Sequence, residues 1–161
     1  MKHLKKLAAL LLVGVLALSL LTACGGGGGS TSADAQAEAA VMAAINENQN
    51  RSGKDKLQNS SELRKIANQD LVAAIKEGNL SPSFTVKSHT DLKNGSVVFT
   101  FIAKCDYKNT DLAKLIKTDT NIKSHYMDKW SDVGVVVRTD KDNGQTYIAI
   151  SVEIKTWAIK T

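Results

Sequence analysis

The spacing of apolar residues changes at the single proline of this chain, Pro82. Between about Asp34 and Pro82, apolar side chains recur every three or four positions, which is the period of an amphipathic helix. Beyond it, several segments alternate apolar and polar residues, which is the period of a strand. The sequence therefore predicts a helical first part followed mainly by a sheet.

Two helices are expected before the proline. The first begins near Asp34 and ends in a polar stretch that closes with Gly53, a residue suited to a left-handed stop. The second begins with a capping box formed by Asn59 and Glu62 and stops at Gly78. The apolar faces are Ala37, Val41, Ala44 and Ile45 in the first helix, and Leu63, Ile66, Ala67, Leu71, Ala74 and Ile75 in the second.

Four strands are expected after the proline, at residues 84–90, 96–105, 132–138 and 146–154. Asn-Gly turns join the members of each pair of strands. A third helical segment starts at Asn109, between the second and third strands, and its polar middle at residues 118–121 is weak. This order predicts an α/β fold, an α-β-α sandwich in which helices cover a mainly antiparallel sheet.

The only cysteine in the second half of the chain, Cys105, is expected to be buried and unreactive. The period of two places it on the same strand face as Phe99 and Phe101. A reactive thiol would instead need exposure and a neighbouring positive group.

The first residues have the pattern of a secretory signal peptide. Three lysines precede an uninterrupted apolar run at residues 7–18, which is shorter than the roughly 20 residues that span a bilayer. Residues 21–24, Leu-Thr-Ala-Cys, resemble the lipobox of bacterial lipoproteins, which implies cleavage before Cys24 and acyl chains, such as palmitate, on that cysteine. We therefore expect a signal peptide at 1–23, a lipidated Cys24 with a Gly/Ser-rich tether at 24–33, and one domain at 34–161.

Export changes the charge of the chain that remains. Removal of the signal peptide takes away three lysines, so 18 of the 21 basic residues and all 16 acidic residues remain, which gives a net charge of about +2. This balance does not favour a nucleic-acid partner. The expected partners are the membrane, through the lipid anchor on Cys24, and an unknown protein or small-molecule ligand.

Both ends of the domain resemble the CAP superfamily, which comprises cysteine-rich secretory proteins, antigen 5 and pathogenesis-related proteins. The first part of the resemblance rests on Asn46, Glu47, Gly53, Leu57, Glu62, Leu63 and Ala67. The second part rests on Trp130, Val133, Gly134, Val135 and Tyr147. The resemblance implies a sandwich fold with a cleft that holds two histidines and two acidic residues, which bind a divalent metal in some members.

Carried over to this chain, the family pattern is incomplete. His89 stands in a Ser-His-Thr step, Asn121 falls where the second histidine is expected, and His125 follows one helical turn later. No acidic residue is found where the early strand should supply one. The possible cleft is therefore His89, Asn121 and His125, and we expect no metal, no cofactor and no catalytic residue.

Three functions remain open. The preferred one is a bacterial surface lipoprotein, exported and anchored to the outer face of a membrane, whose degenerate CAP-like domain is a non-catalytic binding module. The alternative is a metal-dependent hydrolase that uses His89 and His125. A solute-binding lipoprotein of a transporter is the third, although such proteins usually have two lobes.

Overall fold

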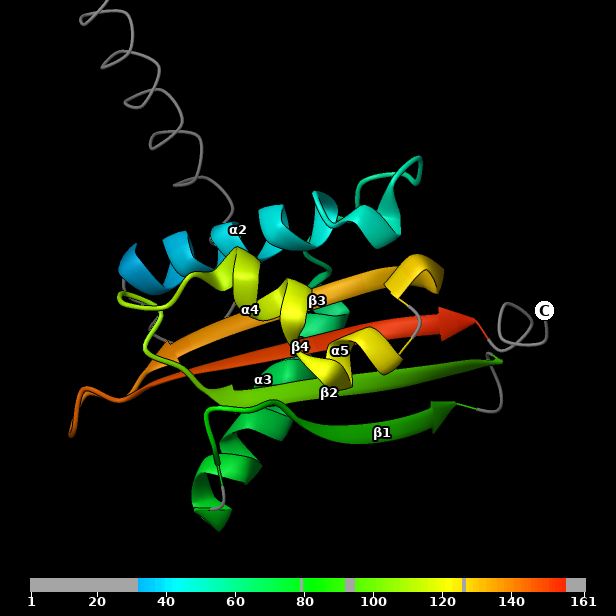
Figure 1. Ribbon diagram of the computed structural model, residues 1–161. Helices are drawn as coiled ribbons and strands as arrows, with labels where there is room; N and C mark the ends of the chain where they lie inside the picture. Colours follow the sequence, from blue (N-terminus) through cyan, green and yellow to red (C-terminus); the bar gives the residue numbers. More distant parts are fainter. Residues whose placement is uncertain (1–31, 79, 92–94, 126, 156–161) are drawn as a thin grey trace, which may run out of the picture.

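The computed structural model describes residues 32–78, 80–91, 95–125 and 127–155 (Figure 1). The expected signal peptide, Cys24 and most of the tether lie outside the described residues. The helices are α2 (Ser32–Asn46), η1 (Gln49–Arg51), α3 (Ser61–Glu77), α4 (Leu112–Thr118), α5 (Thr120–Ser124) and η2 (Met127–Lys129). The strands are β1 (Thr85–Asp91), β2 (Ser96–Lys104), β3 (Trp130–Thr139) and β4 (Thr146–Lys155).

The strands form one antiparallel sheet in the order β1-β2-β4-β3. Two hairpins, β1–β2 and β3–β4, lie side by side, and β2 pairs with β4 in the centre. The mixed α/β class with an antiparallel sheet is confirmed. β3 and β1 are the two edge strands (Figure 1).

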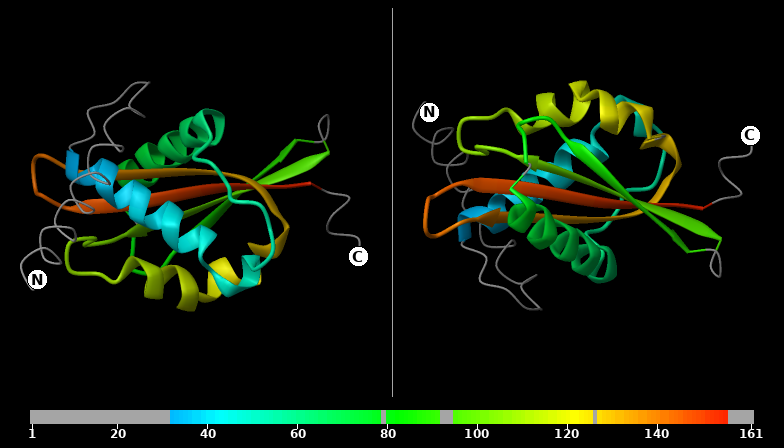
Figure 2. Two further views of the ribbon diagram at one scale, coloured as in Figure 1. Left: turned by 90° about the horizontal axis from the view of Figure 1, so that it is seen from above. Right: turned by 90° about the horizontal axis from the view of Figure 1, so that it is seen from below.

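Helices cover both faces of the sheet (Figure 2). One core cluster joins α2, α4 and α5 to alternate residues of the strands, such as Phe101 and Ile150. The other joins α3 to the intervening residues, such as Ile102 and Ala149. The central strands are therefore buried on both faces. Helix α2 lies along the outer edge of β3 (Figure 1).

The start of α3 differs from the expected capping box. Ser60 is the N-cap, and its hydroxyl oxygen accepts a hydrogen bond from the N–H of Leu63 at 3.4 Å. The prediction of Asn59 as the cap is wrong, because the Asn59 side chain is bound to strand β3. The predicted end is confirmed, since Gly78 adopts the left-handed conformation with φ of 72°.

The predicted stop of the first helix at Gly53 is wrong. α2 ends at Asn46, η1 follows as a separate helical turn, and Gly53 has a φ of 76° in the turn after η1. The weak segment after Asn109 is broken into α4 and α5. Asp119 breaks it, since its carboxylate accepts hydrogen bonds from the N–H groups of Asn121 and Ile122.

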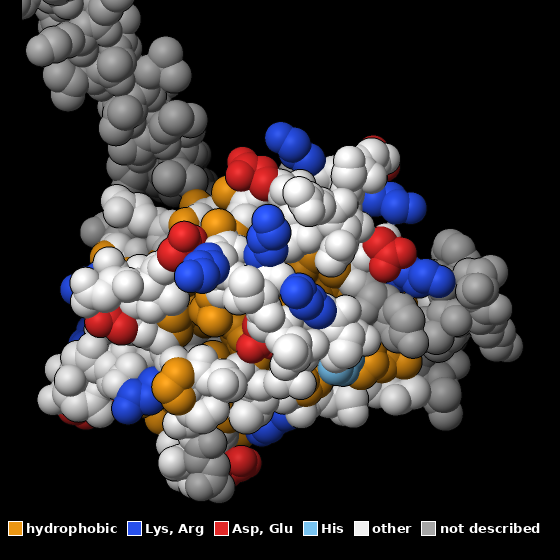
Figure 3. Space-filling model, viewed as in Figure 1, with side chains coloured by type: hydrophobic (Ala, Val, Ile, Leu, Met, Phe, Trp, Pro, Cys, Tyr) orange, Lys and Arg blue, Asp and Glu red, His pale blue; other side chains and the backbone are white. Residues whose placement is uncertain are grey.

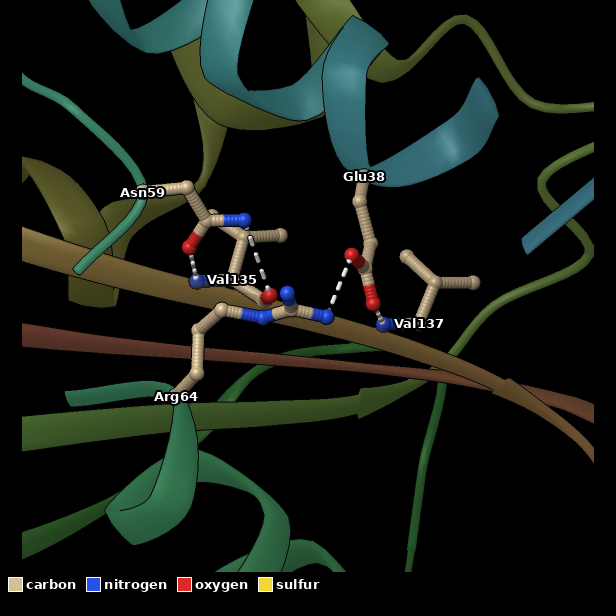
Figure 4. Close-up of polar contacts among 5 residues, drawn as sticks. All are labelled: Glu38, Asn59, Arg64, Val135 and Val137. Atoms are coloured by element: carbon tan, nitrogen blue, oxygen red, sulfur yellow. Dashed lines mark hydrogen bonds and ion pairs between the residues drawn. The ribbon is translucent and has the colours of Figure 1, made fainter. Parts of the chain in front are cut away.

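Polar groups close the outer edge of β3. The side chain of Asn59 accepts from the N–H of Val135 at 2.8 Å and donates to its carbonyl at 3.3 Å. The N–H of Ser60 donates to the carbonyl of Val133 at 2.8 Å. The segment before α3 thus imitates one more strand (Figure 4).

Helix α2 continues this closure with two buried carboxylates. Glu38 accepts from the N–H of Val137 at 3.1 Å and pairs with Arg64 of α3 at 2.7 Å (Figure 4). Asp34 accepts from the N–H of Thr139 at 3.3 Å and from its hydroxyl at 2.6 Å. Burial raises the pKa of Glu38, although the hydrogen bond from Val137 and the charge of Arg64 act in the opposite direction.

Candidate functional site

His89 lies on β1 and faces helix α3. Its Nε2 atom is 2.8 Å from Oδ2 of Asp70, a carboxylate on the buried side of α3. The imidazole is 46% exposed, whereas the Asp70 side chain is 11% exposed. Asp70 was not predicted as a site residue from the sequence. It is a single acid among the apolar residues of a helix, and no local spacing indicates that His89 is its partner.

His125 lies on the other face of the sheet. It is the C-cap of α5, and its Nδ1 atom is 2.5 Å from the backbone carbonyl of Asn121. Its ring meets Phe99 and Phe101 edge-on, with centroid distances of 4.7 and 5.2 Å. The Asn121 side chain donates to the carbonyl of Phe84 at 2.6 Å, so it ties α5 to the start of β1.

The proposed cleft of His89, Asn121 and His125 is therefore not assembled. Asn121 and His125 are neighbours. His89 of β1 pairs with Val98 of β2 and lies on the α3 face of the sheet. His125 packs against Phe99, the residue after Val98, which projects to the opposite face. Over the described part of the chain, no group of three or more His, Cys, Asp or Glu residues is placed to hold a metal ion.

Cys105 is buried, as its strand pattern predicts. It is 5% exposed and belongs to the same core cluster as Phe101 and Ala103. Burial raises the pKa of its thiol. A protonated, enclosed thiol is a poor nucleophile.

Three exposed lysines, Lys114, Lys117 and Lys123, lie on α4 and α5. The view of this face shows basic, acidic and apolar side chains interspersed (Figure 3). The exposure of the three lysines agrees with a solvated helix face.

A cleft of about 490 Å³ lies between the second half of α3 and the β3–β4 hairpin. Its apolar part consists of Val72 and Ile75 from α3 and Tyr147 from β4. Helical spacing places Ile75 one turn after Val72, and Tyr147 is paired across the hairpin with Arg138. This pairing directs an apolar ring and a guanidinium to the same face of the sheet.

Charged side chains surround this apolar part. The cations are Lys76, Arg138 and Lys141, and the acids are Asp140 and Asp142. The Asp140 carboxylate accepts a hydrogen bond from the N–H of Asp142 at 2.9 Å, within the hairpin turn. Among the residues that the structure describes, none of the three cations has an ion-pair partner.

The cleft was missed from the sequence for a simple reason. Val72 and Tyr147 are distant in the chain, and Arg138 belongs to no local motif. A basic residue at the end of an alternating strand was the one available signal.

Comparisons of the chain with protein families, with curated proteins and with solved structures find no match. The resemblance to the CAP superfamily therefore rests on the residues quoted for it. None of the helices in the described segments is long and apolar enough to cross a bilayer.

Proposed function

We propose that this protein is an exported lipoprotein held on the outer face of a bacterial membrane by acyl chains on Cys24. Its domain is a degenerate CAP-like module that binds a ligand and does not catalyse a reaction. The signal-peptide pattern and the lipobox at residues 21–24 support the anchor. The cleft beside α3 supports the binding role.

Contacts between residues that carry the CAP resemblance support that part of the proposal. The side chain of Asn46 donates to the carbonyl of Leu57 at 3.0 Å and accepts from its N–H at 2.8 Å. Gly134 of β3 lies directly against the backbone of Leu63. These contacts involve positions on which the resemblance rests, and the contact of Gly134 with Leu63 links the two ends of the domain.

The single observation that carries the binding role is one cleft that combines apolar side chains with cations that have no ion-pair partner among the described residues. A guanidinium such as that of Arg138 binds a carboxylate through two parallel hydrogen bonds. Val72, Ile75 and Tyr147 provide the apolar surface beside it. The cleft therefore suits a small acid with a flat apolar body.

The metal-dependent hydrolase is the less supported alternative. It needs the imidazoles of His89 and His125 at one ion, and the two side chains lie on opposite faces of the sheet.

Nuclear magnetic resonance titration of the purified full-length protein tests the binding role, with benzoate as the probe and neutral benzamide as its control. Benzoate should shift the amide signals of Val72, Ile75 and Tyr147. An Arg138→Gln variant should bind benzoate about tenfold more weakly, the value of one hydrogen bond to a charged group.

A matched variant, Lys123→Gln, removes an exposed cation on the opposite face of the sheet and should leave benzoate affinity unchanged. Equal affinities in Arg138→Gln and Lys123→Gln, or shifts that avoid the cleft, would contradict the proposed site.

A further inference from the structure

The two edges of the sheet are treated differently. Along β3, the N–H groups of Val135, Val137 and Thr139 point away from the sheet and are bound by Asn59 and by carboxylates of α2. β1 forms the opposite margin and, among the strands of the described segments, pairs only with β2 (Figure 1).

The pairing of the strands identifies which backbone groups of β1 point outward. In an antiparallel pair, every second residue exchanges hydrogen bonds with its neighbour. Because Val135 and Val137 point outward, the residue between them, Val136, bonds to β4. The same alternation across the other ladders makes Lys87 and His89 bond to β2.

The outward-facing backbone groups of β1 are therefore those of Val86, Ser88 and Thr90. Within the described segments, no side chain or backbone group is hydrogen-bonded to them. The strand has neither a proline nor a register shift that would block a further strand, and its one lysine, Lys87, lies 3.8 Å from Glu77 of α3.

We propose that β1 is the contact between two copies of this protein, which pair antiparallel through Ser88 to form one continuous eight-stranded sheet. The three outward residues are placed symmetrically about Ser88, so the same three residues of a second, antiparallel copy can pair with them. Ser88 meets Ser88 of the second copy, and Val86 meets Thr90 at both ends. Each outward N–H and carbonyl of one copy then has a partner on the other.

The side chains fit this register. On the face of α4 and α5, the cross-strand neighbours are Val86 with Thr90 and Ser88 with itself, which are small and uncharged. On the face of α3, Lys87 lies opposite His89 of the second copy, and each is accompanied by its own acid, Glu77 or Asp70. No carboxylate of β1 faces another carboxylate of β1.

The anchor favours a second copy over a foreign strand. The two-fold axis that relates the two copies is perpendicular to the sheet. Rotation about this axis keeps corresponding faces of the two sheets on the same side. The α4–α5 face of both copies then lies on the same side, and the tether at 24–33 allows both lipid anchors to enter one membrane. This step alone rests on the proposed anchoring at Cys24.

Cysteine crosslinking of the full-length protein in membranes tests the contact. In a hydrogen-bonded pair, the two Cα atoms are about 5.5 Å apart, within the range of a disulfide. The Ser88→Cys variant should therefore form a covalent dimer when a mild oxidant is added. The two Thr90 positions are about 14 Å apart in this register, so Thr90→Cys should form none.

Coexpression of Val86→Cys with Thr90→Cys should restore the covalent dimer, because these positions are directly opposite. The wild-type chain, with Cys24 and Cys105, reports any background. Equal crosslinking of Ser88→Cys and Thr90→Cys, or none in either, would overturn the proposal. Crosslinking of Ser88→Cys to a different protein would assign the edge to a foreign strand instead.

Membrane fractionation of the wild-type chain reports anchoring separately from the crosslinks. If the protein were found in the soluble fraction but Ser88→Cys still formed the covalent dimer, the lipid anchor would be refuted and the pairing of two copies through β1 would be supported.

Discussion

At Gly134, the start of helix α3 lies directly against strand β3. A Cβ atom added there would lie 2.3 Å from the backbone carbon of Leu63 and 2.3 Å from the backbone nitrogen of Arg64. Backbone atoms cannot rotate away, so Gly134→Ala should displace the helix. We expect a loss of roughly 3 kcal/mol in the free energy of unfolding, measured by urea denaturation.

Gly144→Ala is the matched control for this substitution. Gly144 has a φ of 69°, but no atom lies within 4 Å of an added Cβ, so only the left-handed backbone opposes the alanine. The loss should be about 1 kcal/mol. If Gly134→Ala were no more destabilising than Gly144→Ala, the close approach of α3 would be refuted.

Cys105 should resist thiol reagents in the folded protein. It is buried, and burial raises the pKa of its thiol, so little thiolate is exposed to a reagent. In a Cys24→Ser background it is the sole cysteine, and its labelling rate with a disulfide reagent should rise sharply on denaturation. A second cysteine at the exposed position Ser83 provides the rate of an accessible thiol. Native Cys105 reacting as fast would disprove its enclosure.

Single residues on strands were predictable, whereas the buried acids were not. The period of two assigned Cys105 and Ile150 to the core, because burial of a strand face depends on local alternation. Asp34, Glu38 and Asp70 are stabilised by backbone N–H groups or by a histidine far along the chain. No local pattern reports such partners.

At the scale of elements, helix ends follow side chains that compete for backbone groups. The end of α3 at Gly78 and the break near Asp119 were predictable from the sequence, because each depends on residues close in the chain. The N-cap of α3 was not, because Asn59 and Ser60 are both good caps. Asn59 instead binds Val135, a contact that depends on where β3 lies.

The contact between α2 and β3 should depend on pH through Glu38. Burial raises its pKa above the usual 4.5, so the folded chain holds this proton more tightly than the unfolded chain. The contribution of Glu38 to stability is therefore largest below the unfolded-state pKa and declines as the pH rises through the folded-state pKa.

A Glu38→Gln variant removes this titration and keeps an acceptor for the N–H of Val137. The unfolding free energy of the wild type minus that of Glu38→Gln should decrease as the pH rises above the usual carboxyl pKa of 4.5, measured by urea denaturation. The exposed Glu62→Gln variant serves as the control. A difference that grows with pH would show that Arg64, and not burial, dominates at this site.

For the molecule as a whole, the order of helices and strands and the antiparallel sheet were predictable, whereas the order of the strands within that sheet was not. Hydrophobic periodicity is local, so it identified the segments on both sides of Pro82. The pairing of β2 with β4 and the cleft beside α3 depend on contacts between distant residues. The same limit explains why His89 and His125 were grouped although the sheet separates them.

Anchoring should depend on one residue of the chain, Cys24. Because acyl chains on this cysteine would hold the protein on the membrane, Cys24→Ser should release it into the medium or block its processing. Fractionation of cells followed by detection of the protein measures the outcome. Cys105→Ser is the control and should remain in the membrane fraction. Full membrane retention and acyl labelling of Cys24→Ser would disprove lipidation.

The closure of β3 by Asn59, Glu38 and Asp34 also limits how far strands can add. A sheet with two free edges can extend without end into a fibre. Here, joining two copies through β1 uses both free edges and leaves only β3 at either margin, where polar side chains already fill the backbone positions that another strand would need. Assembly through β1 is consequently finite, and a crowded layer of these molecules on a membrane would consist of separate pairs.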